Sequence, residues 1–247
     1  MKSVSGIRFD HIAIAVPSLA AAPAFLVGVL GGVPAFGANG GGFRFGQWRF
    51  ANRARIEVLE PAGRASFLHR FLAAHGPGVH HVTFKVPSLA EACARAEARG
   101  YSIVGYDDSY PSWKEAFLHP KQALGIVVQF AEEGPSSGAP PPWVPPPAPA
   151  APPSAVTLIG LRMRAHRREG ADAQWSGVLG GERTETADGG LVYRWSRSPL
   201  QIVVEIDPVA DEGPLAVEFA AERNVDVPAG RHPVLGAVFT RVPLRRE

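Results

Sequence analysis

One segment occurs twice in this chain and constrains its fold more than any other feature. Residues 10–20 read Asp-His-Ile-Ala-Ile-Ala-Val-Pro-Ser-Leu-Ala, and residues 80–90 read His-His-Val-Thr-Phe-Lys-Val-Pro-Ser-Leu-Ala. The shared Val-Pro-Ser-Leu-Ala fixes the register, so that His11 aligns with His81. Each copy predicts a short strand that ends at a proline and leads into a helix opened by a serine. The chain is therefore expected to contain a repeated unit that begins with a strand and a helix.

The residues that follow each copy predict the same order of elements. In the first repeat we expect a strand, a helix that stops at two glycines, two strands with a possible extra strand, and a bridging helix: 8–16, 18–30, 42–52, 54–59 and 64–75. In the second repeat we expect a strand, a helix and three strands: 79–86, 88–99, 101–106, 114–119 and 125–130. The first repeat is thus β-α-β-β with a possible extra strand and the second is β-α-β-β-β, an order that predicts an α+β fold.

A proline-rich segment separates this part from the rest of the chain. Residues 134–154 hold ten of the 24 prolines, which predicts an extended linker, and Trp143 is expected to pin it to a domain surface. Beyond it, 177–181 repeat the Gly-Val-Leu-Gly-Gly of 28–32. We therefore expect a third and a shortened fourth repeat, and three parts in all: a module over 1–133, the linker over 134–154 and a degenerate module over 155–247.

Composition excludes several classes of function. The 25 basic and 23 acidic residues are interspersed, and a net charge of +2 without a basic run gives no case for nucleic-acid binding. The apolar stretch 19–38 is broken by prolines and glycines, so we expect no membrane span. A single cysteine, Cys93, and a start that leads directly into a strand indicate a cytoplasmic protein.

Two histidines at one position of two repeats indicate a metal site. Side chains alternate along a strand, so His81 shares its face with Thr83 and Lys85. Aligning 55–60 over 127–132 places Glu57 over Gln129. Two imidazoles, a carboxylate and an amide oxygen suit a divalent ion such as Mn, Fe, Co, Ni or Zn. Glu57 is the one ionisable oxygen of the set, so we expect it to act as the base if a ligand does so.

The later repeats lack these residues. The repeated glycines place Gly160 where His11 stands, and Thr240 takes the place of Gln129. Glu205 loosely matches Glu57. We therefore expect one metal per chain, in the first module.

Other polar residues have both a functional and a structural interpretation. Arg49, Trp113 and Lys121 are candidates to line the pocket or to contact an anionic substrate, and a structural role is an equal alternative for each. His80 is expected to point away from the pocket, and His119 to support the turn before Pro120. The remaining histidines are expected to be structural: His69, His75, His166 and His232.

The repeated motifs resemble the vicinal oxygen chelate superfamily, which includes glyoxalase I, methylmalonyl-CoA epimerase, extradiol dioxygenases and bleomycin-resistance proteins. The likeness covers 7–133, through the motifs 10–13, 80–86, 117–121 and 125–129. It implies tandem modules of paired β-α-β-β-β units, whose curved mixed sheets form a metal-binding cup. The four ligands of the family then fall on His11, Glu57, His81 and Gln129.

This chain departs from the epimerase pattern at two points. The glutamine and glutamate ligands are exchanged between the repeats, and the separate glutamate base of the epimerase has no obvious match. Extradiol dioxygenases have a carboxylate where Gln129 stands.

The resemblance implies a metal-dependent lyase or isomerase of the glyoxalase or epimerase type. Such an enzyme acts on a small carbonyl or acyl substrate by proton transfer through a metal-stabilised enolate. The alternative is a protein that binds and sequesters a small molecule, as bleomycin-resistance proteins do, and an extradiol-type dioxygenase is the third possibility. Relatives with one module pair between subunits, and the two modules of this chain are candidates to pair internally in the same way. A homodimer of the whole chain is the other arrangement.

Overall fold

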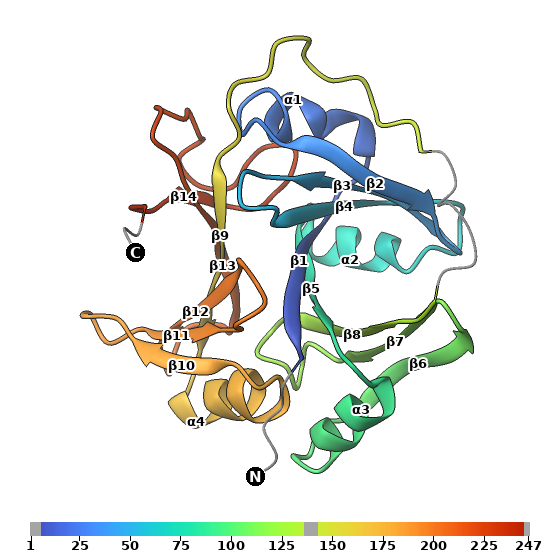
Figure 1. The fold of residues 1–247 in the computed structure, drawn as a ribbon, viewed down its shortest axis with the longest axis vertical. Helices are drawn as coiled ribbons and strands as arrows, with labels where there is room; N and C mark the ends of the chain where they lie inside the picture. Colours follow the sequence, from blue (N-terminus) through green and yellow to red (C-terminus); the bar gives the residue numbers. More distant parts are fainter. Residues whose placement is uncertain (1–5, 136–142, 245–247) are drawn as a thin grey trace. The chain divides into compact units, whose positions relative to one another are not determined.

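The computed structural model describes residues 6–135 and 143–244 (Figure 1). Residues 1–5, 136–142 and 245–247 lie outside the described residues, and with them the start of the chain and Pro140-Pro141-Pro142 of the predicted linker. The chain forms two compact units. Unit 1 comprises Met1–Asp10, His81–Ala139 and Gly160–Leu215, and unit 2 comprises His11–His80, Pro140–Ile159 and Ala216–Glu247. Each unit thus combines a repeat from the first half of the chain with one from the second half, whereas the sequence boundaries 1–133, 134–154 and 155–247 stay a prediction.

The two β-α-β-β-β repeats expected in the first half are present (Figure 1). The first consists of β1 (Arg8–Ala15), the 3-10 helix η1 (Leu19–Ala21), α1 (Pro23–Leu26), β2 (Val33–Asn39), β3 (Phe43–Arg49), β4 (Arg55–Pro61) and the bridging helix α2 (Leu68–His75). The second consists of β5 (Gly78–Lys85), α3 (Leu89–Glu97), β6 (Ile103–Tyr110), β7 (Trp113–Leu118) and β8 (Val127–Glu133). The predicted α+β class is confirmed.

The second half contains a complete third repeat and a shortened fourth one. The third consists of β9 (Thr157–Ala165), α4 (Arg168–Ala171), the π-helix η2 (Asp172–Val178), β10 (Glu182–Glu185), β11 (Leu191–Arg194) and β12 (Gln201–Ile206). The fourth consists of β13 (Gly213–Ala220) and β14 (Phe239–Arg241). None of the helices in the described ranges is long and apolar enough to cross a membrane.

The prediction of one helix over 18–30 was wrong, because the structure has two short helices there, η1 and α1. Pro23 has no backbone N–H to donate into a preceding helical turn, and it instead occupies the first turn of the separate helix α1. The extra strand that the sequence left open is β2. Most residues of β2 are exposed or half-buried, so the strand shows no clear alternation of buried and exposed side chains.

Strand register agrees with the alignment of the two repeats. In unit 2 the strands lie in the order β2-β3-β4-β1, and parallel pairing of β1 with β4 puts Ala13 opposite Glu57. In unit 1 the order is β5-β8-β7-β6, and parallel pairing of β5 with β8 puts Thr83 opposite Gln129. In each repeat the strand residue two positions after the histidine thus faces the position of the aligned glutamate or glutamine.

A glutamate from the last strand of each repeat caps the helix after the Val-Pro-Ser-Leu motif. The backbone N–H of Leu19 donates to Oε2 of Glu60 at 2.7 Å, and that of Leu89 donates to Oε2 of Glu132 at 2.7 Å. Ser18 makes no side-chain capping bond, although its backbone is extended as a helix cap requires. The carboxylates satisfy donors that the first helical turn leaves unpaired.

The repeated Gly-Val-Leu-Gly-Gly ends the helix in the first and third repeats in the same way. Gly31 and Gly180 have positive φ angles of 71° and 68°. The next residues, Gly32 and Gly181, donate their backbone N–H to carbonyls of Leu26 and Trp175 at 2.7 and 2.8 Å. This match supports the alignment of the third repeat with the first.

Aromatic side chains join the two repeats that make up unit 1. Phe84 stacks on Phe9 with ring centroids 4.9 Å apart and meets Trp195 edge-on at 4.8 Å. Trp175 of η2 lies 6.1 Å from the same phenylalanine ring. All four rings are buried, and they form the centre of the core of this unit.

In unit 2 the linker residue Trp143 packs on the sheet. Its ring lies edge-on to Trp48 at a centroid distance of 6.1 Å. Gly37 and Gly46 leave the space for it, since a Cβ added at either position would collide with the indole. The prediction that Trp143 pins the linker to a domain surface is confirmed.

Candidate metal centre

In unit 2 a buried carboxylate faces a buried histidine across β1 and β4. Nε2 of His11 lies 3.5 Å from Oε2 of Glu57, and the two side chains are 2% and 9% exposed. Gln47 on β3 donates from Nε2 to the same carboxylate oxygen at 2.8 Å, and Arg55 donates to Oε1 of Gln47 at 3.1 Å. The orientation of the carboxylate is therefore fixed by a hydrogen-bonded chain.

In unit 1 the amide of Gln129 lies in a similar chain. Thr83 donates its hydroxyl to Oε1 of Gln129 at 2.6 Å, and Nε2 of Gln129 donates to Oε2 of Glu115 at 2.7 Å. Trp113 donates its indole N–H to the same oxygen of Glu115 at 2.8 Å. A carboxylate only accepts, so the amide nitrogen must face Glu115. The amide oxygen, which is the atom that binds metals, lies at the other end and keeps a second lone pair.

In both units the candidate ligand is hydrogen-bonded to a side chain of the complementary type, which the sequence alone did not reveal. The candidate carboxylate Glu57 is held by an amide, Gln47, and the candidate amide Gln129 is held by a carboxylate, Glu115. The alternation of residues along β3 and β7 was the sequence feature that could have identified Gln47 and Glu115. It identifies them only when the strand register is known, because the register pairs Gln47 with Glu57 and places Glu115 diagonal to Gln129.

Within unit 2, His11 and Glu57 fit two ligands of a divalent metal ion. Each offers one ligand atom, the two atoms lie 3.5 Å apart, and both side chains are buried. His81 takes the position of His11 in the second repeat and is buried as well. Two donors that an ion binds at about 2.1 Å in a tetrahedral arrangement are about 3.4 Å apart, and the spacing of His11 and Glu57 is close to this value. Imidazole nitrogens and a carboxylate oxygen are ligands that borderline divalent ions accept. Gln129 is 8% exposed and lies on the same sheet face as His81.

A buried lysine continues that face of unit 1. Lys85 is 6% exposed, and its Nζ lies 3.4 Å from the centroid of the Trp113 ring. Nζ also pairs with Oε1 of Glu133 at 2.8 Å. Burial lowers the pKa of Lys85, and the nearby Glu133 carboxylate opposes that shift.

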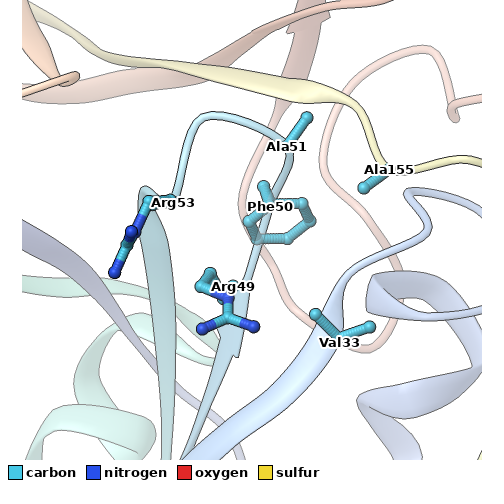
Figure 2. Close-up of a pocket in the computed structure, with 6 residues that line it drawn as sticks. All are labelled: Val33, Arg49, Phe50, Ala51, Arg53 and Ala155. Atoms are coloured by element: carbon cyan, nitrogen blue, oxygen red, sulfur yellow. The ribbon is translucent and has the colours of Figure 1, made fainter.

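The structure brings two of the three predicted substrate residues to these faces. Trp113 is joined to Gln129 through Glu115. Arg49 ends β3 on the face that carries Gln47, and it lines an open pocket (Figure 2). Lys121 instead lies exposed in the turn after β7, where its backbone N–H donates to Nδ1 of His119 at 3.2 Å.

The other histidines have structural surroundings. His80 packs against the rings of Phe67 and Phe71, and burial lowers its pKa to about 4 although the charge of Glu57 opposes this. It therefore stays neutral and belongs to the packing under α2. His119 supports a turn, as expected, but the turn runs through Pro120 and does not precede it, because Nδ1 of His119 accepts from the backbone N–H of Lys121.

The proposed match of Glu205 with Glu57 needs a correction. Gly160 pairs with Gln201 across β9 and β12, so the residue that takes the place of Glu57 is Val203. Glu205 lies two residues further on and forms an ion pair with Arg162 at 2.9 Å. A shift of two residues leaves the alternation of a strand unchanged, so the sequence pattern could not reveal it. Thr240, the residue aligned with Gln129, lies on β14 and pairs with Glu218 of β13.

Comparison with known proteins defines the class of the chain. Residues 10–117 match the family described as the Glyoxalase/Bleomycin resistance protein/Dioxygenase superfamily. An ethylmalonyl-CoA/methylmalonyl-CoA epimerase from Cereibacter sphaeroides is 30% identical over 132 residues, which are 51% of this chain and 97% of the relative. The chain belongs to this superfamily, the vicinal oxygen chelate proteins.

Two further relatives extend the comparison. The uncharacterized protein YqjC of Bacillus subtilis is 29% identical over 137 residues, covering 51% of this chain and 91% of that protein. The crystal structure of a hypothetical protein from Staphylococcus aureus is similar over 97% of this chain and 100% of its own, with a TM-score of 0.65 and 12% identity. That likeness shows that the fold continues through the second half of the chain. Within the superfamily the chain is epimerase-like in its first half.

Proposed function

We propose that this protein is a metal-dependent enzyme of the glyoxalase or epimerase type that moves a proton next to a carbonyl group of a small acyl substrate. The observation that carries the proposal is the buried pair of His11 and Glu57, whose Nε2 and Oε2 atoms lie 3.5 Å apart. We assign His81 as the third ligand, because it aligns with His11 in the second repeat. We assign Gln129 as the fourth ligand, because it occupies the position of Glu57 in the second repeat. The ion is a divalent one such as Mn, Fe, Co, Ni or Zn.

The residues around the ligands are suited to proton transfer. A divalent ion bound there would act as a Lewis acid and make a proton next to a coordinated carbonyl easier to remove. Glu57 is the first candidate to accept that proton, with Gln47 holding its carboxylate in one orientation. Glu115 adds a second carboxylate, held by Gln129 and Trp113, where the sequence had offered none.

The substrate class follows from the relatives. The Cereibacter relative is named for epimerisation of acyl-CoA thioesters. We therefore propose a 2-substituted acyl thioester, with Trp113 and Arg49 as substrate contacts. We also propose a cytoplasmic location, since the single cysteine, Cys93, is a free buried thiol that cannot form an intrachain disulfide.

The test is exchange of the α-proton with deuterated water, followed by mass spectrometry. The metal-loaded protein should exchange the α-proton of a chelating acyl thioester, and an analogue with one oxygen removed should not exchange. Glu57→Gln should lower the exchange rate by at least about 100-fold, because it removes the base and leaves a side chain of the same shape. Glu205→Gln is the matched control and should exchange at the wild-type rate.

Two results would overturn the proposal in different directions. A ligand that binds the metal-loaded protein but neither exchanges nor turns over would favour the sequestering protein. Consumption of oxygen with the same ligand would favour the dioxygenase.

A further inference from the structure

An open pocket lies at the tip of the β3–β4 hairpin in unit 2. It has a volume of about 450 Å³, and six residues line it (Figure 2): Val33, Arg49, Phe50, Ala51, Arg53 and Ala155. The hairpin is closed by two backbone bonds, from the N–H of Phe50 to Ala54 and from that of Arg53 to Phe50, each 2.9 Å long. Arg53 holds a positive φ of 66° in this turn. The backbone that presents both arginines is therefore a defined turn.

Both arginines carry uncompensated charge. Arg49 and Arg53 are exposed, and neither has an acidic partner among the described residues. By contrast, Arg44 on the same strand as Arg49 pairs with Glu60 at 2.6 Å. Two arginines that line one cavity give it a positive charge, and the planar donors of a guanidinium group match the oxygens of phosphate groups.

The walls of the pocket are apolar. Phe50 is 3% exposed and forms a buried floor, whereas Val33 is 44% exposed. Ala155 comes from the segment after the linker. A ligand that carries an oxyanion next to an apolar or aromatic group would use both features.

Register connects this pocket with the proposed metal ligands of unit 2. Arg49 pairs with Arg55 across β3 and β4, and Arg55 pairs with His11 across β4 and β1. Paired residues point to one face of a sheet, so the three side chains form one row. Neighbouring strands are about 4.8 Å apart, which places Arg49 about 10 Å from His11 across the sheet.

We infer that Arg49 and Arg53 bind a phosphate group at the far end of the substrate whose acyl end lies at the metal ligands. The inference rests on the proposed function for the acyl end only. It names the substrate class as phosphate-bearing thioesters, and it assigns the pocket a role in specificity. The anion site itself exists whether or not the metal site is catalytic.

The first experiment measures binding of inorganic pyrophosphate to the full chain by calorimetry at low ionic strength. Wild-type protein should bind it, and Arg49→Ala and Arg53→Ala should each weaken binding at least tenfold. Arg70→Ala, which removes an exposed arginine from α2, should leave binding unchanged. Equal weakening by Arg70→Ala, or unchanged binding in both pocket variants, would overturn the inference.

The second experiment distinguishes a substrate phosphate from a free one. The ratio of kcat/KM for an acyl-CoA thioester to that for its N-acetylcysteamine thioester should fall at least tenfold in Arg49→Ala and should stay constant in Arg70→Ala. A constant ratio in Arg49→Ala together with lost pyrophosphate binding would reject the substrate role and leave a site for free phosphate. Absence of turnover with either thioester, with pyrophosphate binding still dependent on the arginines, would reject the proposed function and retain the anion site.

Discussion

Single residues decide which atom each candidate ligand presents. Gln129 can rotate its amide by half a turn, and only one orientation presents oxygen to a metal. Glu115 selects that orientation because its carboxylate accepts from the amide nitrogen at 2.7 Å. Partners of this kind commonly change metal affinity by about 10- to 100-fold when they are removed.

Glu115→Ala should therefore weaken metal binding about tenfold or more. Glu115→Gln should weaken it less, since an amide oxygen can still accept from Gln129. Competition between the protein and a chelating dye for cobalt, together with the visible spectrum of the cobalt form, measures both. Glu97→Gln on α3 is the control. Wild-type affinity and spectrum in Glu115→Ala would show that this residue does not position Gln129, and lost exchange with normal affinity in Glu115→Gln would instead make it a base.

At the level of elements, the two repeats share an ionic helix cap. Oε2 of Glu132 accepts from the N–H of Leu89, and its Oε1 pairs with Lys114 on β7 at 2.7 Å. Oε2 of Glu60 accepts from Leu19 in the same way, and its Oε1 pairs with Arg44 on β3. The repeated motif therefore docks each helix onto the last strand of its own repeat.

Glu132→Gln should lower the free energy of unfolding by about 1 kcal/mol at pH 7, the usual worth of a helix cap. The bond from Leu89, and then the contact with Lys114, lower the pKa of Glu132 below its ordinary value of 4.5. A lowered folded-state pKa stabilises the protein above the unfolded-state value, and this contribution is lost as the pH falls through the folded-state pKa. The difference between the wild type and Glu132→Gln should thus shrink below pH 4.5. Urea unfolding at pH 7 and at acidic pH measures it, and a difference that does not change with pH would contradict the ionic cap.

On the scale of the whole molecule, the sequence predicted the repeats because their motifs are local. The Val-Pro-Ser-Leu-Ala copies and the repeated glycines lie within single turns and strand ends, whose conformation nearby residues determine. The alignment of Glu57 with Gln129 needed only the alternation of the two closing strands, and the observed register agrees with it.

Features that depend on pairing between distant strands could not be predicted. Gln47 and Glu115 contact the candidate ligands only through the registers of β3 and β7. The misplacement of Glu205 by two residues has the same cause. The compact units also combine repeats from both halves of the chain, through contacts such as that between Phe84 and Trp195. No periodicity within one repeat carries that information.

The central claim is one divalent ion per chain, held by the first module, and elemental analysis of the full chain purified without chelators tests it most directly. Wild-type protein should hold about one equivalent, His81→Ala should hold almost none, and Glu205→Ala should retain the wild-type amount, because Glu205 is engaged with Arg162. Full occupancy in His81→Ala would contradict the account, and so would metal lost from Glu205→Ala but retained in Glu57→Ala.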